Sequence, residues 1–251
     1  MLSLIRGRNS AAPLRVLVLH DCALATERLT RELEHGGTKL VSQRVSSEGA
    51  FLQTLRSFAP DLVLAASTLT NFNARTALQL VQAHYPTAAL ILVTETLDEQ
   101  SAVACLRAGA ENVVLESNLS RLGPATQKAL AVREPLRKLT RRQLQVLRLV
   151  TGGLTSREIA AGLGLSTKTV ETHRSAGMRR LGVDDVTGLV RYAVRVGLIP
   201  QTVSGVASID GAGSRRVAAF IHQTLPYPAQ SRGSSIASSS ASKEPGWYTG
   251  E

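Results

Sequence analysis

One short segment, residues 163–182, constrains the fold of this chain more than any other. Ser166 suits the first cap of a helix, because its side-chain oxygen can accept a hydrogen bond from an amide of the first turn. Gly182 suits the left-handed conformation in which helices commonly end. The residues between them that share one helical face are small or apolar: Val170, Gly177, Met178 and Leu181.

The other face of this expected helix is polar, and it carries Lys168, Glu171, Thr172, Ser175 and Arg179. A helix with one packed face and one face of short, hydrogen-bonding side chains fits the DNA major groove. An ordinary amphipathic surface helix is the alternative, and this helix alone does not exclude it. The neighbouring segments decide between the two interpretations.

Those neighbours predict three more helices around the first. Residues 140–143 and 155–158 each form a capping box, and each box is followed by an apolar stripe. Residues 162–164 are rich in glycine, which takes the positive φ that a tight turn between helices requires. Asp184 or Asp185 can cap a last helix. Four short helices with small-residue turns predict a compact DNA-binding domain that contains a helix-turn-helix.

Residues 139–199 resemble the LuxR-type helix-turn-helix domain. The resemblance rests on the sequence LTRRQLQVLRLVTGGLTSREIAAGLGLSTKTVETHRSAGMRRLGV, whose combined spacing and residue types are very specific. The chain departs from the family at Gln143 and Gln145, where the family usually has Glu. Because Gln143 can still complete its capping box, we expect this departure to affect stability rather than function.

The resemblance implies roles for side chains of the last two helices. The residues expected to read base edges are Glu171, Thr172 and Ser175. The residues expected to contact phosphates are Lys168, Thr169, Arg174 and Arg179. The residues expected to pair two copies about a two-fold axis, once part of the stripe has packed within its own domain, are Val186, Leu189, Val190 and Ala193. The implied partner is double-stranded DNA with an inverted-repeat operator, bound by a homodimer.

The positive charge of the chain is concentrated in this second half. Residues 13–130 hold 10 Lys and Arg against 11 Asp and Glu, whereas residues 137–199 hold 12 against 4. The net charge therefore changes from −1 to +8 between the two stretches, which indicates a polyanionic partner for the second stretch alone. The length of 251 residues agrees with two domains, since one domain takes roughly 150 residues.

The first half of the chain predicts an α/β domain. Short apolar runs alternate with helical stretches, and they lie at residues 15–19, 39–41, 61–66, 90–94 and 112–115. Strands that are apolar throughout predict a parallel sheet covered by helices on both faces. We therefore expect a doubly wound, five-stranded parallel sheet of flavodoxin-like order, with its functional site at the C-terminal ends of the strands.

This half resembles the receiver domain of response regulators, and the order of the two domains resembles the NarL/FixJ family. Phosphorylatable receivers hold Mg²⁺ with an acidic pair after the first strand, where this chain has His20 and Asp21. The family's acceptor Asp falls on Ala66 and its Lys falls on Glu116, so that only Thr94 matches, at the switch Ser/Thr position. Without a carboxylate at position 66 no aspartyl phosphate can form there. We therefore expect a degenerate receiver that keeps the fold and has lost phosphotransfer.

Several interpretations of the whole chain stay open. The receiver-like domain could bind an unknown small ligand, dock a protein, or only dimerise. We expect a sequence-specific DNA-binding transcription regulator, with RNA polymerase as a further candidate partner. The alternative is a regulatory protein that does not bind DNA and docks a partner through its receiver-like or helical domain. Salt-dependent, saturable binding to a defined duplex separates the two.

An enzyme is not expected, because we find no phosphate-cradling glycine loop, no metal-binding cluster and no nucleophile–base pair. Cys22 and Cys105 form neither a disulfide framework nor a metal set, so no cofactor is expected. Residues 1–12 lack the apolar stretch of a signal peptide, and no run approaches the roughly twenty apolar residues of a membrane span. These features predict a cytoplasmic, bacterial protein that associates with the nucleoid when bound to DNA.

The expected division of the chain has four parts. The receiver-like domain takes residues 13–132, and a short linker takes residues 133–138, with Pro135 expected to end the preceding helix. The helix-turn-helix domain takes residues 139–199. Residues 200–251 are rich in Ser, Gly and Ala, and we expect a disordered tail.

Overall fold

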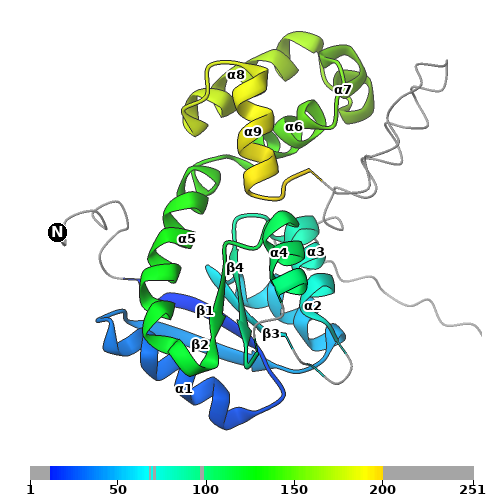
Figure 1. Cartoon of the computed structure of the whole chain (residues 1–251). Helices are drawn as coiled ribbons and strands as arrows, with labels where there is room; N and C mark the ends of the chain where they lie inside the picture. Colours follow the sequence, from blue (N-terminus) through cyan, green and yellow to red (C-terminus); the bar gives the residue numbers. More distant parts are fainter. Residues whose placement is uncertain (1–11, 68, 70–71, 97–98, 200–251) are drawn as a thin grey trace, which may run out of the picture.

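The computed structural model of the chain describes residues 12–67, 69, 72–96 and 99–199 (Figure 1). The expected tail therefore lies outside the described residues. A sheet domain comes first, and four helices follow it on one side. No helix of this described part is long and apolar enough to cross a membrane.

The sheet has the predicted five strands, all parallel, in the order β2-β1-β3-β4-β5, which confirms the flavodoxin-like order. The strands are β1 (Leu14–Leu19), β2 (Leu40–Val45), β3 (Leu62–Ala66), β4 (Ala89–Thr94) and β5 (Asn112–Leu115). Every residue of β3 and β4 is buried, as expected for strands covered on both faces.

Helices cover both faces of the sheet. One face is covered by α1 (Ala23–His35) and α5 (Leu122–Arg137). The other face is covered by α2 (Glu48–Phe58), α3 (Ala74–His84) and α4 (Glu99–Arg107). Alternation along β1 divides the core, since Val16 and Val18 pack toward α1 and α5 while Leu17 and Leu19 pack toward α2 and α3. A 3₁₀ helix, η1 (Glu116–Arg121), joins β5 to α5.

The predicted helical domain consists of α6 (Arg141–Thr151), α7 (Ser156–Leu163), α8 (Thr167–Leu181) and α9 (Val186–Arg195). Its N-terminal caps are those that the sequence predicts. Thr140 and Gln143 form a reciprocal capping box, as do Thr155 and Glu158. Asp185, one of the two candidates, caps α9 by accepting from the amide of Gly188. A separate apolar core lies among these helices.

The helix α5 does not end before Pro135, so that prediction is wrong. It continues to Arg137, and the segment expected to be a linker forms its last turn. Proline removes only one hydrogen bond here, and tertiary contacts hold the residues that follow it. Leu136 is fully buried in the core of the helical domain, and Arg137 is hydrogen-bonded to the sheet domain. The two cores therefore share α5.

Candidate nucleic-acid interface and receiver-like pocket

The helix α8 is fixed at both ends and along one face, as the sequence predicts. Ser166 accepts from the amide of Thr169 at 3.1 Å, and Gly182 ends the helix with a φ of 68°. The buried residues of α8 are the predicted ones: Val170, Gly177, Met178 and Leu181. Gly177 lies against α6, where a Cβ atom would come within 2.9 Å of Leu147 Cδ1. Glycine thus allows α6 and α8 to approach closely.

The three residues expected to read bases are brought together on the outer face of α8. Glu171, Thr172 and Ser175 are all exposed. The hydroxyl of Thr172 donates to the backbone carbonyl of Lys168 at 2.9 Å. Because this hydrogen is used within the helix, Thr172 offers its methyl group and an acceptor oxygen to a partner.

The residues expected to contact phosphates differ in exposure. Lys168 and Arg179 are exposed beside the base-reading residues, whereas Thr169 and Arg174 are partly buried at the flanks of α8. The hydroxyl of Thr169 also lies 2.8 Å from that of Ser166. Lys168 and Arg179 are therefore better placed for a polyanion than the other two.

A hydrogen bond between α6 and α8 was not anticipated from the sequence. Arg180 Nη1 donates to Gln143 Oε1 at 2.5 Å and to the carbonyl of Lys138 at 3.2 Å. Gln143 also accepts from the amide of Thr140 at 3.0 Å. The glutamine at position 143, where the family usually has Glu, is the sequence feature that could have indicated this contact. Its amide oxygen accepts from both Thr140 and Arg180 and leaves the charge of Arg180 unneutralised.

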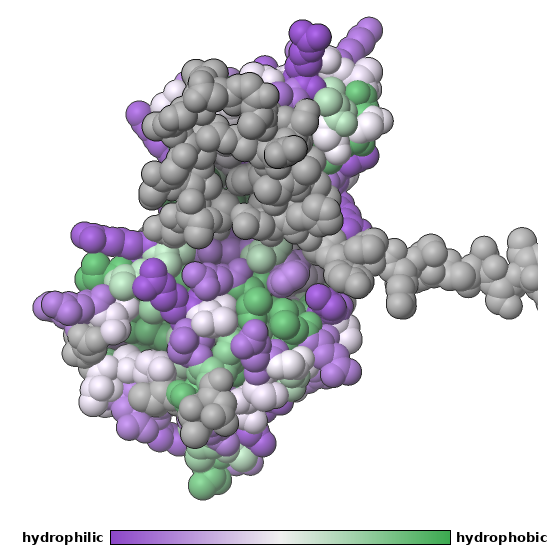
Figure 2. Space-filling model, turned by 90° about the vertical axis from the view of Figure 1, so that its right-hand side faces the viewer, coloured by the Kyte–Doolittle hydropathy of each residue, from purple (hydrophilic) through white to green (hydrophobic). Residues whose placement is uncertain are grey.

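The positive charge of the helical domain is not neutralised from within. No ion pair joins two described residues of the stretch 138–199, and two of its four carboxylates serve as helix caps. The hydrogen bonds from Thr155 lower the pKa of Glu158 from its ordinary value, which keeps that cap ionised. Figure 2 shows hydrophilic side chains projecting from the end of the molecule formed by this domain. Such a surface suits a polyanion.

The apolar stripe expected to pair two copies needs a correction. Leu189 and Ala193 are fully buried within their own domain, so they cannot contact a second copy. The outward side of α9 carries Val186, which is 43% exposed, and Val194, which is 57% exposed, with the partly buried Val190 between them. These three valines follow a spacing of four residues and form one stripe.

The residues expected to form a degenerate phosphorylation pocket, called the degenerate pocket below, lie at the C-terminal ends of the strands. His20 follows β1, Ala66 ends β3, Thr94 ends β4, and Glu116 follows β5. His20 Nε2 lies 3.6 Å from Glu116 Oε1. Asp21 lies beside them and is exposed.

Polar contacts surround these residues, and two arginines take part: Arg44 donates to the carbonyls of His20 and Asp21 at 3.3 Å, and Arg28 Nη1 lies 4.0 Å from Glu116 Oε2. The amide of Cys22 donates to His20 Nδ1 at 3.0 Å, so Nε2 carries the hydrogen that faces Glu116. The hydroxyl of Ser67 donates to that of Thr94 at 2.8 Å. Ala66 offers no nucleophile, and no group of described residues has the composition of a metal site. The acceptor carboxylate and the lysine of a phosphorylatable receiver are thus replaced by Ala66 and Glu116, whereas Asp21 and Thr94 are present.

Comparison with known protein families matches residues 137–193 to the family of bacterial regulatory proteins of the luxR type. Residues 137–193 are a LuxR-family domain. This LuxR-family domain comprises α6, α7 and α8 and most of α9, and its match begins at the last residue of α5.

Curated relatives extend the similarity over different lengths. The chain is 38% identical over 63 residues to the transcriptional regulatory protein MctR of Rhizobium johnstonii, a match that covers 25% of this chain and 29% of MctR. The response regulator protein VraR of Staphylococcus saprophyticus is 23% identical over 208 residues, covering 74% of this chain and 99% of VraR. The chain thus spans under a third of MctR but nearly all of VraR.

Among solved structures, the response regulator RcsB of Salmonella typhimurium is similar to this chain with a TM-score of 0.41. The two sequences are 19% identical, and the match covers 72% of this chain and 97% of RcsB. A second RcsB structure, described as two dimers bound to two parallel DNAs, has a TM-score of 0.40 and 22% identity and covers 72% of this chain and 98% of that one.

Proposed function

We propose that this protein is a sequence-specific, DNA-binding transcription regulator that works without aspartyl phosphorylation. The observation that carries the proposal is the outer face of α8, where Glu171, Thr172 and Ser175 are exposed together. They lie on a LuxR-family domain whose positive charge has no internal ion pair among its described residues. The relatives named as transcriptional or response regulators support the same class.

The exposed side chains of α8 take two roles in DNA binding, base reading and phosphate contact. Glu171 can accept from a cytosine amino group, and Thr172 can place its methyl group against that of thymine. Lys168 and Arg179 contact phosphates, which set the register and most of the affinity without carrying sequence information. Thr169 and Arg174 contribute from the flanks of the helix.

Two copies of the chain pair through α9. The exposed stripe of Val186, Val190 and Val194 is apolar and self-complementary about a two-fold axis. Pairing along α9 places two copies of α8 in successive major grooves, so the operator is an inverted repeat with half-sites about one helical turn apart. The regulator acts in the bacterial cytoplasm, and RNA polymerase is the partner that control of transcription implies.

Independence from phosphorylation follows from the composition of the pocket. Ala66 stands where an acceptor carboxylate is needed, and Glu116 stands where a cation would neutralise the phosphoryl group. The pair of His20 and Glu116 links the ends of β1 and β5 directly. A signal, if one acts here, is a bound ligand or protein rather than a phosphoryl group.

The experiment that tests the proposal is selection of bound genomic fragments by the purified full-length protein, with no phosphodonor present. A compact inverted repeat is the expected result. The variant Lys168→Ala should bind every selected fragment more weakly, whereas Lys128→Ala, which removes an exposed lysine of α5, should bind as the wild type does. Enrichment of no sequence would overturn the proposal and favour the alternative of a helical domain that docks a protein, and equal binding by wild type and Lys168→Ala would overturn the phosphate contact assigned to Lys168.

A further inference from the structure

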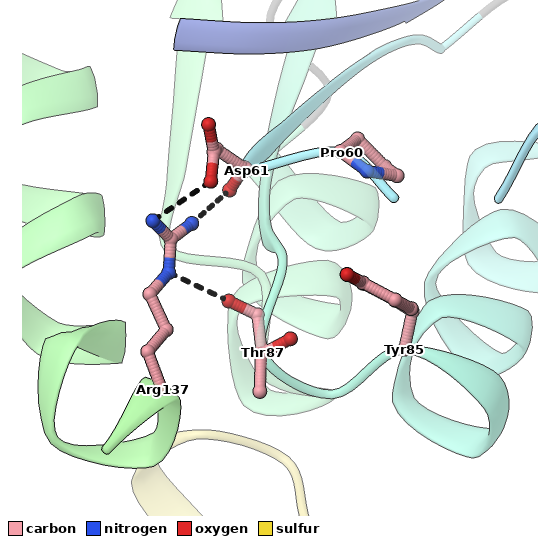
Figure 3. A pocket seen from close by; sticks show the side chains of 5 residues that line it. All are labelled: Pro60, Asp61, Tyr85, Thr87 and Arg137. Carbon is pink, nitrogen blue, oxygen red and sulfur yellow. Dashed lines mark hydrogen bonds and ion pairs between the residues drawn. The ribbon is translucent and has the colours of Figure 1, made fainter. Parts of the chain in front are cut away.

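The helical domain docks on the edge of the sheet where β3, β4 and β5 begin, which is the edge opposite the degenerate pocket (Figure 1). Arg137 of α5 anchors this edge (Figure 3). Its Nη1 lies 2.9 Å from Asp61 Oδ1, while Nη2 donates to the carbonyl of Asp61 at 3.0 Å and Nε to that of Thr87 at 3.4 Å. With Pro60 and Tyr85, these residues line a small cavity of about 240 Å³. The donors of Arg137 are engaged by the protein, so this cavity offers no ready ligand site.

A second contact joins α6 to the end of α3, and it is built differently. Arg148 of α6 is only 7% exposed, and its Nη1 donates to the carbonyl of Ala83 at 3.2 Å. That carbonyl belongs to the last turn of α3, where carbonyls lack partners within the helix. The guanidinium therefore caps the negative end of a helix in the other domain, an arrangement that favours a cation.

This contact leaves polar atoms unsatisfied. Three buried side-chain nitrogen or oxygen atoms of the described residues lack a hydrogen-bond partner, and two of them are Arg148 Nε and His84 Nδ1. Burial lowers the pKa of Arg148 to about 10, which leaves it charged at neutral pH. A buried guanidinium that makes one hydrogen bond and has no carboxylate partner loses hydration that this contact does not replace. The contact therefore stabilises the docking of the two domains only weakly.

His84 is the last residue of α3, and two arginines lie near enough to act on its charge. Arg56 comes from α2, and Arg148 comes from α6. The strands packed against α3, which are β3 and β4, contain no charged residue. Burial, then Arg56, then Arg148 lower the pKa of His84 below its ordinary value of 6.5.

We propose that the contact between α3 and α6 is a proton-sensitive latch, in which a proton on His84 and the guanidinium of Arg148 compete for the same helix end. Neutral His84 allows Arg148 to cap α3. Protonated His84 places a cation on its own helix terminus and repels Arg148, so α6 separates from α3. The two domains stay joined through α5 and through the packing of Gly197 against Gly109 and Gln82, so only the contact between α6 and the end of α3 opens.

The direction of the pH dependence follows from linkage. When the contact opens, His84 loses the burial and the repulsion by Arg148, although Arg56 of its own domain remains. Its pKa then rises back toward 6.5, so the open form binds the proton more tightly. The contact is therefore at full strength above about pH 6.5 and weakens as the pH falls through that value. The equilibrium constant for closure falls by at most about tenfold per pH unit, since one proton is involved.

Hydrogen exchange of the full-length chain tests the latch, with His84→Gln as the matched variant. Glutamine keeps a polar side chain at the end of α3 and cannot be protonated. The readout is the exchange rate of amides in α6, compared between wild type and variant at the same pH, which removes the intrinsic effect of pH on exchange. At pH 7.5 the two proteins should exchange alike. At pH 5.5 the wild type should exchange up to about tenfold faster.

Two outcomes would overturn the proposal. Equal exchange at both pH values would show that His84 does not control the contact. A difference of the same size at both pH values would show that glutamine alters packing and that the proton has no part. The variant Arg148→Gln serves as a second check, because without the guanidinium the change in α6 exchange between the two pH values should match that of His84→Gln.

Discussion

Replacing Gly177 with alanine should force α8 and α6 apart and destabilise the LuxR-family domain. A Cβ atom at this position would lie 2.9 Å from Leu147 Cδ1 and 3.2 Å from its Cγ. Leu147 cannot move aside, because it is 1% exposed and surrounded by the core of the domain. Its neighbours must shift to admit the methyl group.

The expected magnitude is a balance of two opposing effects. Alanine is favoured over glycine in a helix interior by about 1 kcal/mol. Overpacking a well-filled core costs about 1–3 kcal/mol. We therefore expect the substitution to lower the free energy of unfolding by about 1 kcal/mol, and Gly177→Val to lower it by more.

Urea unfolding followed by circular dichroism measures this change. Gly49→Ala is the matched control, because Gly49 lies in the first turn of α2 and a Cβ atom there meets nothing within 4 Å. The control should gain about 0.4–1 kcal/mol. If Gly177→Ala also gains stability, the close approach of the two helices does not require glycine and our reasoning is refuted. A smaller loss in the background of Leu147→Val would confirm that these two residues are the ones in conflict.

Three further predictions follow from other contacts. Thr172→Ala should shift sequence preference at one position of the operator, whereas Lys168→Ala should weaken binding to all sequences and reduce the salt slope by about one unit; equal losses from both in a salt series would contradict this division. Arg133→Met should lower the free energy of unfolding by about 3–5 kcal/mol, because it leaves the buried Glu111 unpaired, and an unchanged urea midpoint would contradict that cost. Asp185→Ala should cost about 1 kcal/mol through loss of the α9 cap, measurable as a lower melting temperature of the helical domain.

Local rules account for what the sequence predicted well. The caps at Ser166 and Gly182 and the buried face of α8 depend only on residues within one helix and its turns, so spacing and residue type suffice. The five strands follow from continuous apolar runs, and their order came from the resemblance to receivers. The predicted base-reading residues lie together because they share one helical face.

Contacts between distant residues account for the errors. A stripe of apolar residues on α9 shows that part of it packs within its own domain but not which part, so the sequence does not separate Leu189 and Ala193, which are fully buried, from the exposed Val186. Pro135 predicts a helix end by local rules, and the core contact of Leu136 overrides it. The burial of Arg148 cannot be predicted from local sequence, because it depends on the docking of one domain on the other.

The sharing of α5 by the two cores also limits how this protein can be recombined. The first turns of α5 pack against the sheet through Leu122, Ala125 and Ala129, while Leu136 packs in the core of the helical domain. A chimera joined between residues 132 and 133 would cut α5 in two. Each half of α5 would then continue into a foreign segment that lacks the contacts which the other half makes in this protein. A graft of this helical domain onto another sensor should therefore include all of α5, together with the end of the sheet where Arg133 pairs with Glu111 and Arg137 pairs with Asp61. The exchangeable module is larger than the 137–193 match by which its family is recognised.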